Sequence, residues 1–162
     1  RMGLHIVLVE PEIPQNTGNI ARTCAATGAE LHLVAPLGFS LEDRYLKRAG
    51  LDYWHLLTVH RHPSFDQFME ACGDGSLFYV TTKARQVYSD VHYPPESYLL
   101  FGKETAGLPE DLLKAHPERC IRIPMIGAAR SLNLSNAAAI VAYECLRQQG
   151  FGGMRRQGDF PQ

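Results

Sequence analysis

Short apolar runs alternate along the chain with segments whose apolar positions recur at helical spacing. The runs predict strands at residues 4–9, 31–35, 53–59, 77–82, 98–101 and 120–123. The segments between them predict helices at residues 16–26, 41–49, 64–71, 109–115 and 133–149. Strands that alternate with helices are typical of a parallel sheet covered on both sides. The pattern therefore predicts an α/β fold, with a mostly parallel sheet and helices on both faces.

Two of the predicted helices carry recognisable end signals. Asn16 or Thr17 can cap the first helix, because their side chains accept hydrogen bonds from free backbone N–H groups. Gly28 supplies the stop of that helix, since glycine readily takes the left-handed conformation found there. Asn133 or Ser135 is predicted to open the last helix in the same way.

The composition is that of one globular domain. The 162 residues are 45% hydrophobic and 20% charged. We expect the domain to span residues 2–150, followed by a loosely ordered tail at 151–162, and we interpret Arg1, which precedes Met2, as a cloning remnant. Because no run is long enough to cross a membrane and no secretory segment is evident, we expect a cytoplasmic protein without a membrane partner.

Charge and cysteine usage narrow the function classes. The four cysteines form no C-x-x-C pair and no His-x₃-His spacing accompanies them, so we expect no metal site and a reducing compartment. The formal net charge of −1 does not indicate a nucleic-acid partner, which usually calls for a basic surface. Local clusters of basic residues nevertheless keep a nucleic-acid partner among the alternatives.

Three polar segments that contain glycine or asparagine each follow a predicted strand. They span residues 11–22, 101–109 and 123–136. Ligands of open α/β sheets bind beyond the carboxyl ends of the strands. We therefore expect the three segments to form one composite site.

The segments differ in the chemistry that they offer. Gly102 lets the backbone approach a ligand closely, but its surroundings match neither G-x-x-x-x-G-K-[ST] nor G-x-G-x-x-G, so a phosphate cradle is not indicated. Arg22 suits a phosphate or carboxylate, although a surface arginine or an ion pair would also explain it. The hydroxyls and amides at 131–136 suit an uncharged polar ligand or a redundant helix cap. No G-x-S-x-G elbow supports serine hydrolysis.

Taken together, the segments resemble the three motifs of the SPOUT RNA methyltransferases, most closely the TrmL type that methylates the ribose 2′-hydroxyl of the tRNA wobble nucleotide. The resemblance runs from Ile6 to about Gln149. Three stretches are specific to this subgroup. They are Glu10-Pro11-Glu12-Ile13-Pro14 together with Asn16-Thr17-Gly18-Asn19; Arg48-Ala49-Gly50-Leu51-Asp52-Tyr53; and Asn133-Leu134-Ser135-Asn136.

The resemblance implies several properties that the residues alone do not. It implies a deep C-terminal trefoil knot, a homodimer in which both subunits complete each site, and S-adenosylmethionine bound in the knot as methyl donor. The donor contacts that it implies are Val80, Gly102, Ile123 and Ser131. Val80 stands where leucine is expected, but it remains apolar.

The resemblance also implies which residues act on the RNA. The catalytic candidates are Arg22, Asn16, Glu104, Ser135 and Asn136. Arginine keeps its proton, so Arg22 would anchor a phosphate and stabilise the developing alkoxide instead of acting as a base. Asn16, Ser135 and Asn136 would orient the ribose or the helix start, while Glu104 would order its loop or pair with Arg22.

The tRNA would bind a surface made by the dimer, since no separate RNA-binding domain is evident. The candidates for that surface are Arg44, Lys47, Arg48, Arg61, Arg130 and Arg155. The alternatives are the same fold acting on another tRNA or ribosomal RNA ribose, and an RNA-binding homologue without catalysis. A nucleotide-binding oxidoreductase is disfavoured, because the phosphate fingerprint is absent.

Overall fold

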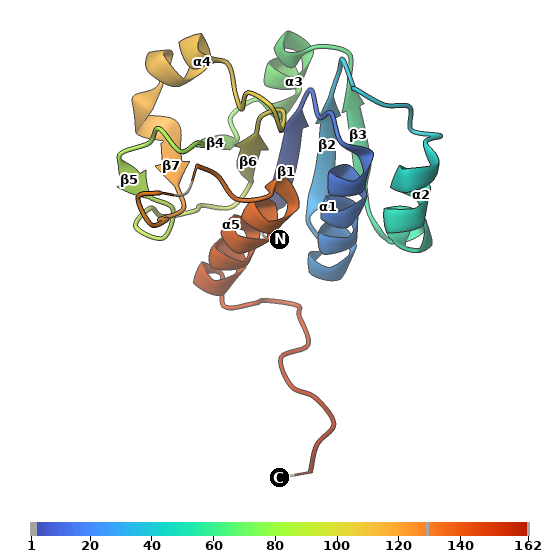
Figure 1. Cartoon of the computed structure of the whole chain (residues 1–162). Coiled ribbons are helices and arrows are strands. Elements are labelled where there is room, and N and C mark those ends of the chain that lie inside the picture. Colours follow the sequence, from blue (N-terminus) through green and yellow to red (C-terminus); the bar gives the residue numbers. More distant parts are fainter. Residues whose placement is uncertain (1–2, 129, 162) are drawn as a thin grey trace.

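The computed structural model describes residues 3–128 and 130–161, without the side chains of residues 45 and 49–53, so Arg1 lies outside the described residues (Figure 1). The strands are β1 (Leu4–Val9), β2 (Glu30–Val34), β3 (Val59–His62), β4 (Ser76–Val80), β5 (Gln86–Val87), β6 (Ser97–Phe101) and β7 (Cys120–Arg122). The helices are α1 (Pro14–Thr27), α2 (Arg44–Gly50), α3 (Phe65–Cys72), α4 (Glu110–Ala115) and α5 (Leu134–Gln148), with 3₁₀ turns η1 (Leu51–Leu56) and η2 (Pro117–Arg119).

The described strands form one sheet in the order β3-β2-β1-β6-β4-β7-β5. Every pairing between these strands is parallel, which confirms the predicted sheet. The chain builds outward from β1 to β3 and then crosses to the other side, so that β1 and β6 become neighbours at the point where the strand order reverses. The carboxyl ends of both strands meet at one edge, where ligands of such sheets bind.

Helices cover both faces of the sheet, as predicted: α1, α2 and α5 lie on one face, and α3 and α4 on the other (Figure 1). Side chains of a strand point alternately to its two faces. In β1, Ile6 and Leu8 pack with α1 and α5, whereas Val7 and Val9 pack with α3 and α4. The last helix therefore rests against α1, β1 and β6, the elements at the centre of the sheet.

Several predicted elements differ from the structure. The strand predicted at 53–59 is wrong, because residues 51–56 form η1 and β3 begins only at Val59. Trp54 and Leu57 both pack on the core from this turn, and a spacing of three residues fits a 3₁₀ helix. The predicted cap of α1 is also wrong: Pro14 starts the helix after Ile13, whose side chain makes no cap. Gly28 ends α1 with φ of 80°, as predicted.

The four cysteines are buried and free. Burial raises the pKa of the Cys24 and Cys145 thiols to about 12, so both stay protonated in the core. Among the described residues, no group of histidine, cysteine and acidic side chains is arranged to hold a metal ion. Likewise, no helix within the described ranges is long and apolar enough to cross a bilayer.

The tail begins packed on the domain and then leaves it. Phe151 and Met154 pack against the core cluster beside α5. From Arg155 onward the described residues are exposed and run away from the sheet (Figure 1). Arg155 forms an ion pair with Asp159 inside the tail. The loose order of residues 151–162 stays a prediction.

A row of hydrogen-bonded histidines crosses the α3 face of the sheet. Nδ1 of His5 lies 2.9 Å from Nε2 of His32, and Nδ1 of His32 lies 2.9 Å from Nε2 of His62. Nε2 of His5 donates to Glu96 at 2.7 Å, because a carboxylate can only accept. The neutral row is then satisfied when each Nε2–H donates to the next ring, from His62 through His32 to His5.

Lowering the pH from 7 to 5 is expected to reduce the free energy of unfolding by up to about 2 kcal/mol through His32 alone. Burial, followed by the charges of His60, His5 and His62, lowers the pKa of His32 from 6.5 to about 3. Below pH 6.5 the unfolded chain therefore binds a proton that the folded protein excludes, which costs about 1.4 kcal/mol per pH unit. Urea unfolding at the two pH values measures this loss.

The variant His32→Gln provides the control for this pH dependence. It removes the titrating ring, so the unfolding free energy should fall less steeply between pH 7 and 5. A smaller slope should remain, since burial also lowers the pKa of His62. The same slope in the variant and in the original protein would contradict the assignment to His32.

Candidate functional site

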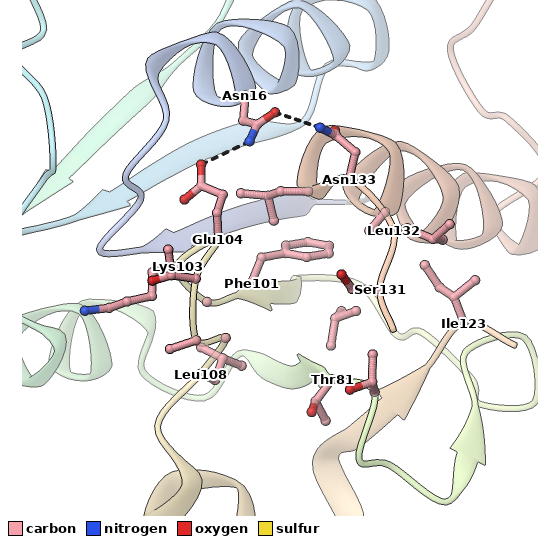
Figure 2. A pocket seen from close by; sticks show the side chains of 18 of the residues that line it. Asn16, Thr81, Phe101, Lys103, Glu104, Leu108, Ile123, Ser131, Leu132 and Asn133 are labelled. Carbon is pink, nitrogen blue, oxygen red and sulfur yellow. Dashed lines mark hydrogen bonds between the residues drawn. The ribbon is translucent and has the colours of Figure 1, made fainter. Parts of the chain in front are cut away.

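The three polar segments line one cavity at the carboxyl edge of the sheet (Figure 2). Its volume is about 510 Å³, and it lies beyond the ends of β4, β6 and β7. The lining comes from the starts of the loops after these strands, from Ile13 and Asn16 at the start of α1, and from the residues just before α5. The structure therefore brings the three predicted segments together, and their role as one binding site stays a prediction.

All four predicted donor contacts lie around this cavity: Val80, Gly102, Ile123 and Ser131 line it. They come from β4 and from the loops after β6 and β7, which only the fold brings together. Thr81, which the sequence did not single out, completes the wall together with Phe101, Leu108, Leu132 and Asn133 from the predicted polar segments (Figure 2). Apolar side chains together with exposed loop backbone are the usual lining of a small-molecule site.

The loop after β6 folds back tightly on Gly102. A Cβ atom at this position would lie 1.9 Å from the carbonyl carbon of Gly107 and 2.1 Å from the backbone nitrogen of Leu108. Gly107 has φ of 71° and donates its N–H to the Lys103 carbonyl at 2.8 Å, which closes the turn. The fold of the loop itself therefore requires glycine at position 102, because the backbone of Gly107 and Leu108 leaves no room for a side chain.

Glu104 reaches out of this loop and binds the backbone just before α1. Its carboxylate accepts hydrogen bonds from the backbone N–H groups of Glu12 at 2.8 Å and Ile13 at 2.9 Å. It also accepts one from Nδ2 of Asn16 at 3.1 Å. Negative charge at a helix N-terminus is favourable because free N–H groups gather there. The predicted role of Glu104 in ordering its loop extends to the start of α1.

Asn16 and Asn133 continue this link to the last helix (Figure 2). Oδ1 of Asn16 accepts from Nδ2 of Asn133 at 3.2 Å. Oδ1 of Asn133 in turn accepts from the backbone nitrogens of Ser135 and Asn136 and from the Ser135 hydroxyl, so Asn133 is the cap of α5. Side-chain hydrogen bonds therefore join all three polar segments in one chain.

The remaining catalytic candidates lie outside the cavity lining. Ser135 and Asn136 form the first turn of α5, and the Ser135 hydroxyl is bonded to Asn133 at 2.6 Å. Arg22 lies on α1 with an exposed side chain. The structure thus gathers Asn16 and Glu104 at the cavity, places Ser135 and Asn136 directly after its lining residues 131–134, and leaves Arg22 on the exposed side of α1. The roles of all five remain predictions.

The six basic candidates for an RNA surface occupy separate places. Arg44, Lys47 and Arg48 are exposed on α2, where Lys47 pairs with Glu42 at 2.7 Å. Arg61 lies on the edge strand β3 and alternates with the inward histidines, which directs it to the α2 face. The other two are remote from α2, with Arg130 beside Ser131 and Arg155 in the tail.

Comparison with known proteins identifies the class that this fold and site belong to. A model described as the SpoU rRNA methylase family matches residues 3–143, and the chain belongs to this family. The resemblance to SPOUT methyltransferases is thereby confirmed. A protein named tRNA (cytidine(34)-2′-O)-methyltransferase from Escherichia coli K12 is 52% identical over 151 residues, covering 93% of this chain and 96% of that protein. A Listeria innocua protein is 55% identical over 159 residues, covering 96% and 94%.

Solved structures agree with this assignment. One, described as giving insight into 2-OH methylation of C/U34 on tRNA, has a TM-score of 0.88 and 46% identity, and covers 92% of this chain and 97% of that chain. The SpoU methyltransferase AviRb from Streptomyces viridochromogenes, in complex with AdoMet, has a TM-score of 0.82 and 29% identity over 94% of this chain and 63% of that chain.

Proposed function

We propose that this protein transfers a methyl group from S-adenosylmethionine to the ribose 2′-hydroxyl of the wobble nucleotide of tRNA. The observation that carries the proposal is the convergence of all three motif segments on one cavity, joined by the bonds from Glu104 through Asn16 to Asn133. The names of the relatives at about half identity supply the substrate class and position.

The cavity fits the proposed methyl donor. A volume of about 510 Å³ is within the range of small-molecule sites, which is about 300–1,000 Å³. Val80 and Ile123 offer apolar contacts, while Gly102 and Ser131 offer backbone and hydroxyl groups for polar ones. When bound, the donor supplies an electrophilic sulfonium methyl group, so the protein mainly has to orient the ribose and assist loss of its proton.

The chain's own residues divide this work. The Glu104 carboxylate is already bonded to three donors and serves to hold α1 and the loop after β6. Asn16, Ser135 and Asn136 lie where the two helices begin and would orient the ribose. Arg22 would bind an RNA phosphate and stabilise the developing alkoxide, because its guanidinium stays charged.

A homodimer would bring Arg22 into a complete site. The described surface carries exposed apolar side chains at the start of α1, before α5 and along α5: Ile13 (42% exposed), Leu132 (40%), Ile140 (36%) and Tyr143 (43%). Because α1 and α5 pack together and Asn16 bonds Asn133, these side chains belong to neighbouring elements. Covering them with a second copy would place the cavity at an interface, where Arg22 of one subunit can serve the other.

The C-terminal region of this fold is proposed to be knotted. The chain passes from β7, near one edge of the sheet, back to α5 on its centre, and the segment before α5 lines the same cavity as the loop after β6. A trefoil knot forms if the chain passes through a loop on this return path. A reducing cytoplasm fits the free buried cysteines and a tRNA substrate.

Methyl transfer to tRNA tests the proposed function directly. Bulk tRNA lacking the modification is incubated with the protein and labelled S-adenosylmethionine, and the product is mapped nucleoside by nucleoside. A 2′-O-methyl group at the first anticodon nucleotide is the expected result. A 2′-O-methyl group at another tRNA ribose or at a ribosomal RNA ribose would show that the substrate is a different nucleotide. Donor binding without methyl transfer to any RNA would favour a non-catalytic role.

Reversing the charge of α2 is expected to weaken tRNA binding broadly. The double variant Lys47→Glu, Arg48→Glu should lower affinity at least about tenfold for unrelated tRNA sequences, and reduce the salt slope by about 1 for each lost phosphate contact. The control is Lys114→Glu on α4, across the sheet. Unchanged binding in the double variant, or an equal loss in the control, would show that α2 is not the docking surface.

A further inference from the structure

Two glutamates exchange hydrogen bonds between the loop after β1 and the loop after β6. Oε1 of Glu12 accepts from the backbone nitrogen of Thr105 at 3.0 Å and from its hydroxyl at 2.8 Å. Glu104, next to Thr105, accepts from the backbone nitrogens of Glu12 and Ile13 at 2.8 and 2.9 Å. We refer to these four bonds as the Glu12–Glu104 exchange.

The sheet brings these loops side by side, and the exchange then fixes their conformation. Leu8 and Phe101 are register partners in the parallel pair of β1 and β6, so both loops leave the same edge. Hydrogen bonds to a carboxylate are about twice as strong as neutral ones. The bonds to Thr105, and then the charge of Lys103, lower the pKa of Glu12, which keeps this carboxylate ionised at neutral pH.

The backbone around Glu12 is also held by the segment that follows β2. Gly38, in the segment after β2, donates its N–H to the Pro11 carbonyl at 2.9 Å. A Cβ atom on Gly38 would lie 2.9 Å from the Glu12 Cα, so the two backbones are in close contact. The backbone of Glu12 is therefore held against the β2 side, and its side chain is the part that reaches the loop after β6.

The residues of the Glu12–Glu104 exchange adjoin both the cavity and the start of α1. Ile13, Glu104 and Thr105 line the cavity, and α1 begins at Pro14, directly after the exchange. We propose that Glu12 is a positioning residue for methyl transfer: by holding Thr105 while Glu104 holds the start of α1, it couples the geometry of the donor cavity to the helix that carries Asn16 and Arg22. This inference rests on the proposed function.

Removing the Glu12 carboxylate should affect donor binding and transfer separately. In Glu12→Ala, calorimetry with S-adenosylmethionine and no RNA should show affinity about tenfold lower, because residues 104–106 lose their outer anchor. At saturating donor the rate of tRNA methylation should still fall about tenfold, since α1 is no longer aligned with the cavity. The variant Glu12→Gln keeps one acceptor oxygen and should recover part of both losses.

Two further variants test whether the losses come from the hydrogen bonds between Glu12 and Thr105 or from the removal of a carboxylate charge. Glu10→Gln removes one carboxylate charge from the same loop, where Oε1 of Glu10 lies 3.3 Å from Nζ of Lys103. This variant should bind the donor with an affinity within about twofold of that of the original protein. Thr105→Val removes the hydroxyl partner, and combining it with Glu12→Ala should cost no more than Glu12→Ala alone. Additive losses, or an equal loss in Glu10→Gln, would overturn the inference.

The measurements also separate this inference from the proposed function. If the original protein binds donor and methylates tRNA but Glu12→Ala and Glu12→Gln match it in affinity and rate, the positioning role alone is wrong. If the original protein binds no donor, the proposed function fails, and the positioning role fails with it. Thermal unfolding of each variant identifies any that is misfolded. If Glu12→Ala is misfolded, the donor affinity of Thr105→Val tests the inference in its place.

Discussion

Replacing Gly102 with alanine is expected to weaken binding of S-adenosylmethionine by about 10- to 100-fold. The added methyl group would meet the backbone of Gly107 and Leu108 at 1.9–2.1 Å, and backbone atoms cannot turn aside as a flexible side chain can. The loop after β6 must then open, and overpacking of this kind costs about 1–3 kcal/mol. Since this loop lines the cavity, the loss should appear in donor affinity measured by calorimetry.

The matched control for this change is Gly127→Ala. A Cβ atom at Gly127 would meet nothing within 4 Å, and the residue lies in the loop that follows β7, at the same edge of the sheet. Donor affinity should stay close to that of the original protein. Equal affinities of the Gly102→Ala and Gly127→Ala variants for the donor would show that the tight turn at Gly102 is not needed for the site.

Replacing Arg22 with alanine is expected to abolish methyl transfer while donor binding is retained. Arg22 is exposed on α1 and does not line the cavity, so its loss removes no surface from the donor site. Its proposed contact is with the RNA phosphate and the developing alkoxide, and removing one such stabilising donor costs about 10²–10³ in rate. Single-turnover transfer at saturating donor measures the rate, and calorimetry measures the donor affinity.

A subunit-mixing experiment shows whether Arg22 acts across the dimer. Arg22→Ala subunits keep an intact cavity, whereas Gly102→Ala subunits keep the arginine. If each site takes Arg22 from the partner, mixed dimers contain one complete site and activity returns. No recovery, although mixed dimers form, would place Arg22 in the site of its own subunit. A loss of donor affinity in Arg22→Ala would contradict the proposed role altogether.

The sheet could be predicted because its signal is local. The central strands are near-continuous apolar runs, since both faces are covered, and β1, β4 and β6 were placed within one or two residues of their true ends. The strand β5 has only two residues, Gln86 and Val87, which is too short for any periodicity. The error at 53–59 has the same origin, because Trp54 and Leu57 are apolar without a period that separates a strand from a 3₁₀ turn.

The meeting of the three polar segments is predictable from the sequence, but the hydrogen bonds that connect them are not. Asn16 or Thr17 is the predicted cap of α1, yet the helix starts earlier at Pro14. The backbone just before it is held by Glu104, about 90 residues away in the sequence. Asn133 is predicted as a helix cap and as part of the third motif, but neither prediction includes the bond from its amide to Asn16. Such pairs follow from the register of β1 and β6 and from where α5 returns. No local pattern encodes them.

The position of α5 has a consequence for how the protein is made. This helix ends at Gln148, yet it packs against β1 and α1, which are translated well before it. Ile6 and Ile20 are fully buried in the finished protein and belong to the cluster that α5 completes. During translation part of the surface around them therefore stays uncovered until α5 has been made, and exposed apolar surface of this kind favours aggregation of incomplete chains.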